Sequence, residues 1–185
     1  GKPLYSVKEV GTSDITGTRQ QFWPDGSIFT ETVYDYKILA SRLRELAYLN
    51  AGLRISLTDR RVVNEDGSFK SEQFYSEEGL REFVRFIESS REHLINDVIY
   101  LNSEKQGIPI EVAIMYNTGL SENVHSYVNN LNTIEGGTHL ACFRRALTRK
   151  LKKYAEDSKM LEKVKVDISG DDFREGLTAV ISVKV

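Results

Sequence analysis

The stretch from 139 to 155 concentrates positive charge. It holds six Lys or Arg side chains and no Asp or Glu, although the whole chain has a formal net charge of −2. The six are Arg144, Arg145, Arg149, Lys150, Lys152 and Lys153. Guanidinium and ammonium groups at this density bind phosphate oxygens, so the run favours contact with a polyanion such as nucleic acid. A basic run is also typical of a solvated helix face, and the residue types alone leave both interpretations open.

A helix must position these cations. Apolar residues recur at steps of three and four and predict one helical stripe: Leu140, Phe143, Leu147, Leu151 and Tyr154. The glycines at 136 and 137 allow positive φ before the helix, and Thr138 is the expected N-cap. A glycine pair at a helix start could bind an anion, but no Walker lysine follows it. We therefore favour a structural role for the pair.

A second charged cluster consists of Asp171, Asp172, Arg174 and Glu175. Paired carboxylates could act in acid–base chemistry. We favour the interpretation that Arg174 pairs with an acid and fixes the turn into the last strand, so we assign no catalytic residue here.

Metal and thiol chemistry find little support in the sequence. His93, His125 and His139 lie far apart and no cysteines are paired, so no zinc spacing exists and no metal site is predicted. The single cysteine, Cys142, excludes an intrachain disulfide and fits a reducing, cytoplasmic location. We expect it to be a small packed side chain rather than a reactive thiol.

The remaining pattern predicts an α+β fold. Helices are predicted at 35–50, where Asp35 can cap, and at 77–89. An Asp66-Gly67 hairpin turn is also expected. Alternating residues predict strands at 4–10, 18–23, 53–58, 69–75, 97–103, 108–116, 123–131, 164–168 and 177–185. We expect the helices to lie on one face of the sheet.

The composition, 40% hydrophobic and 28% charged, is typical of a globular protein with a core. No apolar run reaches the 18 or more residues of a membrane span, and no signal peptide is recognisable. The chain starts without Met and ends inside a strand-like run, so we expect it to be part of a larger protein.

Two motifs resemble one family. They are TIEGGTH at 133–139, followed by Phe143-Arg144 and by ALT at 146–148, and GDDFREGL at 170–177, followed by AVISVKV. Together they are similar to the ATPase subunit of bacterial type II DNA topoisomerases, with the gyrase B type as the better match and the topoisomerase IV type second. The resemblance covers essentially the whole chain.

This resemblance implies two domains. Residues 1–30 would be the C-terminal end of a nucleotide-binding ATPase domain of the gyrase and heat-shock-ninety type. Residues 31–185 would be the transducer domain, a ribosomal-protein second-domain-like sandwich with a left-handed βαβ crossover. The boundary is expected between 26 and 34. The transducer would stop before the loop that carries the family's switch lysine.

The same resemblance implies function. The parent protein would use ATP and Mg²⁺, pair with a second copy of itself and with a DNA-cleaving subunit, and capture duplex DNA. Thr18, in the TGT run at 16–18, matches a residue on the adenine side of ATP. Arg144 matches an arginine that lines the DNA cavity, with weaker companions at Arg145, Arg149, Lys152 and Lys153. Cys142 departs from the family's usual glycine.

The family's catalytic residues would precede residue 1. We therefore expect these 185 residues alone neither to bind ATP tightly nor to hydrolyse it. Two alternatives remain open from the sequence. One is a non-enzymatic nucleic-acid-binding module of ribosomal-protein-like fold. The other is a mechanical coupling domain with no DNA affinity of its own.

Overall fold

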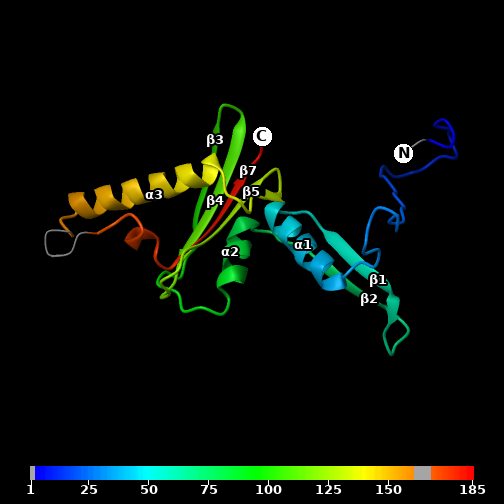
Figure 1. Cartoon of the computed structure of the whole chain (residues 1–185), viewed down its shortest axis with the longest axis horizontal. Helices are drawn as coiled ribbons and strands as arrows, with labels where there is room; N and C mark the ends of the chain where they lie inside the picture. Colours follow the sequence, from blue (N-terminus) through cyan, green and yellow to red (C-terminus); the bar gives the residue numbers. More distant parts are fainter. Residues whose placement is uncertain (1–2, 161–167) are drawn as a thin grey trace. The chain divides into compact units, whose positions relative to one another are not determined.

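A computed structural model describes residues 3–160 and 168–185 (Figure 1). The chain divides into two compact units, Gly1–Tyr34 and Asp35–Val185. Residues 164–167 of the predicted strand 164–168 lie outside the described residues. No helix in the described ranges has the length and apolar character that a bilayer crossing requires.

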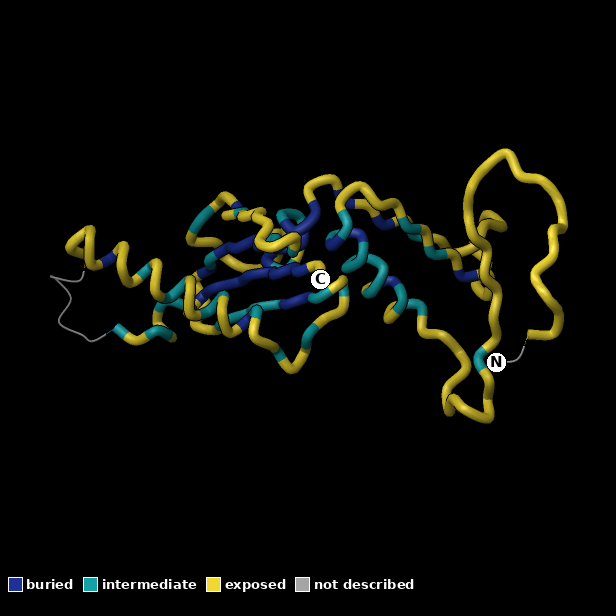
Figure 2. The backbone as a smooth tube through the Cα atoms, turned by 90° about the horizontal axis from the view of Figure 1, so that it is seen from above, coloured by how far each residue is buried: buried dark blue, intermediate teal, exposed yellow. Residues whose placement is uncertain are grey.

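The Gly1–Tyr34 unit contains no helix or strand among its described residues, 3–34. The predicted strands at 4–10 and 18–23 are therefore wrong. Alternating residues make a strand only where a neighbour takes up the backbone N–H and C=O groups. In the described residues no such neighbour pairs with these segments, and Leu4 and Val7 are almost fully exposed. Figure 2 shows almost all of the described part of this unit as exposed.

The second unit begins with a capped helix and a hairpin. Helix α1 (Tyr36–Leu49) starts where the Ile38 amide donates to Asp35 Oδ1 at 3.0 Å, which confirms the predicted cap. Strands β1 (Ile55–Val63) and β2 (Phe69–Phe74) pair antiparallel. Gly67 turns between them with φ of +80°. Ala40, Ala47 and Phe74 form a small core between helix and hairpin.

A five-stranded sheet forms the centre of this unit in the described part of the chain. Its order is β3 (Ile99–Lys105), β4 (Ile108–Tyr116), β7 (Leu177–Val183), β5 (Asn123–Val128) and β6 (Leu131–Asn132). The central strand β7 is antiparallel to β4 and parallel to β5. Parallel neighbours need a long crossover connection, and here it contains helix α3 (Thr138–Asp157).

The helices that cover this sheet lie on its two opposite faces, so the expected one-sided arrangement is wrong. Helix α2 (Leu80–Glu88) packs on a core that includes Ala113 and Met115. Helix α3 packs on the core that includes Val112 and Ile114. Successive strand residues point to opposite faces, and in β4 both sets are apolar. Figure 2 shows the central strands as the most buried part of this unit.

Candidate nucleic-acid interface

Two glycines set the start of α3. Gly136 and Gly137 have φ of +81° and +156°, as their predicted structural role requires. The helix begins at Thr138 with Gly137 in the cap position, and no side chain caps it, so the expectation that Thr138 is the N-cap is wrong. Thr138 is already helical, whereas a capping side chain must come from the residue before the first turn.

A short hydrogen-bond chain fixes this start to the sheet. The Thr133 hydroxyl lies 2.6 Å from Ser126 Oγ, donates to the Ser126 carbonyl at 2.9 Å, and lies 3.1 Å from His139 Nε2. Ser126 belongs to β5 and is buried. The TIEGGTH run therefore anchors the first turn of α3 to the sheet, and its Thr133 and His139 side chains are engaged in structure.

The inner face of α3 follows the predicted stripe over most of its length. Leu140 is buried, and Phe143 and Leu147 pack against the sheet core that contains Val112 and Ile181. The last member differs, because Tyr154 is 62% exposed and the neighbouring Ala155 is buried instead.

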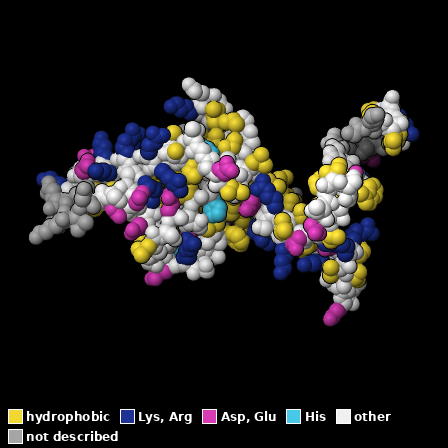
Figure 3. Space-filling view, in the orientation of Figure 1, with side chains coloured by type: hydrophobic (Ala, Val, Ile, Leu, Met, Phe, Trp, Pro, Cys, Tyr) yellow, Lys and Arg dark blue, Asp and Glu magenta, His cyan; other side chains and the backbone are white. Residues whose placement is uncertain are grey.

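The outer flank of α3 forms a cationic groove of about 610 Å³. Lys and Arg side chains gather over α3 in Figure 3. The groove is lined by Ala141, Arg144, Arg145, Thr148, Arg149, Lys152 and Arg174. Four of the five predicted DNA-contacting residues therefore line one concavity, and Lys153 does not. At about 100° per residue, position 153 lies about 40° beyond 149 around the helix and about 180° from 144, which places it past the edge of the groove.

Arg144 is partly solvated and oriented by a carboxylate. Its Nε donates to Glu122 Oε1 at 2.8 Å, and 41% of its side chain is exposed. The side chain is therefore accessible to a ligand. Glu122, in the loop between β4 and β5, carried no sequence signal because its partner is 22 residues away in the chain.

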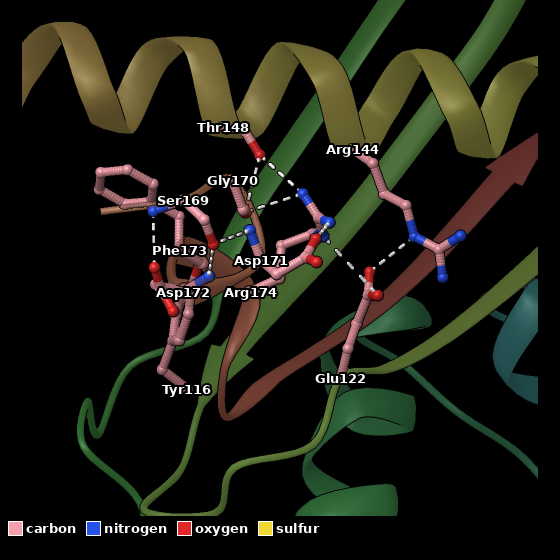
Figure 4. Close-up of polar contacts among 10 residues, drawn as sticks. All are labelled: Tyr116, Glu122, Arg144, Thr148, Ser169, Gly170, Asp171, Asp172, Phe173 and Arg174. Atoms are coloured by element: carbon pink, nitrogen blue, oxygen red, sulfur yellow. Dashed lines mark hydrogen bonds and ion pairs between the residues drawn. The ribbon is translucent and has the colours of Figure 1, made fainter. Parts of the chain in front are cut away.

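Arg174 fixes the turn before β7, as predicted (Figure 4). Its Nη1 donates to Thr148 Oγ1 at 2.9 Å and to the Gly170 carbonyl at 2.8 Å. Its Nη2 pairs with Asp171, and its Nε lies 3.7 Å from Glu122 Oε2. Sequence reasoning did not place Arg174 in the groove, because only the fold brings residue 174 beside α3.

The remaining described contacts of this cluster are also structural. Asp172 Oδ2 accepts from the Ser169 amide at 2.6 Å, and the segment Asp172–Arg174 is a short 3₁₀ helix. The Tyr116 hydroxyl donates to the Phe173 carbonyl at 2.9 Å. Burial raises the pKa of Tyr116, which favours the protonated hydroxyl that donates this bond. These bonds support the structural interpretation of the cluster.

A buried carboxylate holds the loop that carries Glu122. Glu88 has no exposed surface. It accepts from Thr178 Oγ1 at 2.7 Å, Asn117 Nδ2 at 2.9 Å and Arg91 Nη1 at 3.2 Å. Asn117 Oδ1 in turn accepts from the Gly119 amide at 2.7 Å. Glu88 thus joins α2, β7 and the start of the β4–β5 loop.

The other predicted residues lie elsewhere. Cys142 is exposed on α3, so the expectation that it is packed is wrong. Position 142 faces away from the apolar stripe, and Arg145 Nη2 lies 3.9 Å from its Sγ. Thr18 is exposed in the Gly1–Tyr34 unit, where its adenine contact stays a prediction. Within 3–160 and 168–185, no three His, Cys, Asp or Glu side chains form a group that could hold a metal ion.

Comparisons with known proteins agree on one family. The model described as DNA gyrase B matches residues 79–185. The DNA gyrase B protein of Cytophaga aurantiaca is 62% identical over 185 residues, covering 100% of this chain and 39% of that protein. The Staphylococcus aureus protein is 44% identical, with 100% and 28% covered. The chain thus spans about two fifths or less of the length of these relatives.

Solved structures agree as well. The 43K ATPase domain of Thermus thermophilus gyrase B, in complex with an aminocoumarin, superimposes with a TM-score of 0.73 at 31% identity, covering 88% of this chain and 43% of that one. The gyrase B protein of Myxococcus xanthus has the same TM-score at 22% identity, covering 87% and 43%, which indicates a shared fold.

Proposed function

Because the chain belongs to the DNA gyrase B family, we propose that it is the part of an ATP-dependent type II DNA topoisomerase that couples nucleotide use to capture and passage of a DNA duplex. The observation that carries this proposal is the solvent-accessible cationic groove on α3, with Arg144 in it. The comparisons give no support to the alternative of a non-enzymatic ribosomal-type module.

We assign residues 1–30 to the end of the ATPase domain and 31–185 to the transducer. The parallel β5–β7 pair, joined through α3, supports a βαβ unit of the ribosomal-protein second-domain type. We also propose that the connection from β5 through α3 to β7 is left-handed. In such a unit α3 is held rigidly against the sheet, so the groove would move as one body with β7.

The groove suits the sugar–phosphate backbone of a duplex. Arg144, Arg145, Arg149 and Lys152 supply donors only, along one flank of a helix. The pattern lacks the paired donor and acceptor that read a base edge, so we assign phosphate contacts and no sequence preference. Binding of this kind is driven by counterion release and weakens steeply with salt.

For the parent protein, we further propose that it is cytoplasmic and that it uses ATP and Mg²⁺. Its proposed protein partners are a second copy of the same chain and a DNA-cleaving subunit. Only Thr18 is assigned a contact to ATP, and the described ranges contain no acidic or His cluster suited to a metal ion. We also propose that these 185 residues alone do not hydrolyse ATP, and ATP turnover by the isolated chain would refute this.

A salt titration of duplex binding tests the groove. Binding of a fluorescein-labelled duplex is measured by anisotropy between about 50 and 200 mM salt, the range over which phosphate contacts lose most affinity. Arg144→Ala should weaken binding and reduce the salt slope by about one ion. Lys150→Ala removes the same charge from the same helix outside the groove and is the matched control. Equal effects of the two variants would argue against a specific groove.

A further inference from the structure

We propose that Glu122 is the positioning residue of the groove: it holds Arg144 through Nε so that the two terminal nitrogens face a DNA phosphate. This inference rests on the proposed function, since it names what orients the guanidinium assigned to the duplex. Glu122 favours DNA binding by orienting Arg144 and not through its own charge, because a carboxylate beside a phosphate site repels the phosphate.

The contact geometry leaves the phosphate-binding side of Arg144 available. Glu122 Oε1 accepts from Arg144 Nε at 2.8 Å. Within the described residues, no hydrogen bond or ion pair engages Nη1 or Nη2 of Arg144. In Figure 4 these two nitrogens point away from Glu122. A guanidinium held at Nε still presents its terminal pair of donors, which is the fork that binds phosphate in a bidentate way.

Glu122 can act as a support because it is itself held in place. Its second oxygen lies 3.7 Å from Arg174 Nε, and its side chain is 22% exposed. Arg174 is fixed in turn by Thr148, Gly170 and Asp171. The chain of contacts therefore runs from the turn before β7, through Arg174 and Glu122, to Arg144.

Charge and geometry act in opposite directions at this site. Arg144 and Arg174 contribute two positive charges, and Glu122 and Asp171 contribute two negative charges, so the cluster is formally neutral. Removing the charge of Glu122 should strengthen attraction to DNA. Removing its hold on Arg144 should restore side-chain rotation, which must be frozen again on binding.

Two substitutions separate these effects. Glu122→Gln removes the charge but keeps an amide oxygen that can accept from Arg144 Nε. Glu122→Ala removes the same charge and the contact. We expect E122Q to bind a labelled duplex more tightly than the unsubstituted chain, and more tightly than E122A by about threefold to tenfold, within the coupling range of contacting residues. The difference between Gln and Ala should vanish in an Arg144→Ala background.

Glu122→Asp is the companion variant with unchanged charge. Its carboxylate is one methylene shorter and cannot reach Nε from the same backbone, so weaker binding than the unsubstituted chain is expected. Far-UV circular dichroism melts of each variant establish folding. A direct readout is ¹⁵N relaxation of Arg144 Nε–H, which should be ordered in the unsubstituted chain and E122Q and mobile in E122A and E122D.

The outcomes separate the two proposals. If Arg144→Ala leaves duplex binding unchanged, the proposed function fails, whereas the Nε relaxation still decides whether Glu122 orients Arg144. If Arg144→Ala weakens binding but E122Q and E122A bind equally, the positioning role is refuted and the groove stands. A Gln–Ala difference that persists without Arg144 also overturns the role, because Glu122 would then act on another group.

Discussion

Glu88→Gln is the substitution whose cost the structure defines best. Gln can still accept from Thr178 and Arg91 with its amide oxygen, but its NH₂ group then meets Asn117 Nδ2, which now donates to Glu88 Oε2 at 2.9 Å. Two donors would face each other. Asn117 cannot reverse its amide without losing the bond from the Gly119 amide to its Oδ1. The substitution therefore leaves a buried polar group without a partner.

The magnitude follows from these contacts. An unsatisfied buried donor costs about 1–3 kcal/mol, and hydrogen bonds to a charged group that become neutral lose about 1 kcal/mol more. We expect the free energy of unfolding of the Asp35–Val185 unit to fall by about 2–4 kcal/mol. Glu92→Gln makes the same charge change at a nearby exposed side chain and should stay within about 0.5 kcal/mol of the unsubstituted chain.

Urea unfolding at about pH 7, followed by far-UV circular dichroism at the helix band, measures the difference. Fluorescence is unsuitable because Trp23 lies in the other unit. The midpoint should shift with an unchanged slope. If E88Q and E92Q lose equal stability, the buried carboxylate does not hold the β4–β5 loop, and the reasoning is refuted.

Four further predictions follow from local geometry. Gly176→Ala should lower the melting temperature strongly, because a Cβ there would lie 2.2 Å from a backbone oxygen at φ of +68°. Gly67→Ala, at φ of +80° in open space, should cost only about 1 kcal/mol. The hydrogen bond from the Arg61 side chain lowers the pKa of Asp59 to about 2. The contribution of the ionised Asp59 to stability should therefore be complete above about pH 4 and be lost as the pH falls through about 2. A titration of this carboxyl near pH 4, followed by NMR, would contradict the prediction. Cys142 should react with a thiol reagent in the native chain, and protection until unfolding would show it to be packed.

Local signals in the sequence predicted the elements of the second unit well. The Asp35 cap, the Asp66-Gly67 turn and the first three members of the α3 stripe depend on residues within one or two turns of each other, and all are confirmed. Tyr154, the last member of the stripe, is exposed. Each depends on short-range geometry, which one segment specifies by itself.

The features that the sequence predicted wrongly or did not predict depend on residues that are distant from each other in the chain. Residues 4–10 have the pattern of a strand but no neighbouring strand among the described residues. Met115 and Ala113 interrupt the alternation expected of a one-sided sheet, and only the placement of α2 on their face explains them. Glu122 and Arg174 join the groove only because the crossover brings the turn before β7 beside α3.

The central place of β7 has a consequence for how the molecule forms during synthesis. All seven of its residues are buried, yet it leaves the ribosome after every other described strand of its sheet. Until then β4 and β5 have no shared neighbour, and both expose hydrogen-bonding edges beside apolar side chains. A nascent chain halted before residue 177 should therefore bind a chaperone. Once β7 has left the ribosome and paired with β4 and β5, the chain should dissociate from that chaperone.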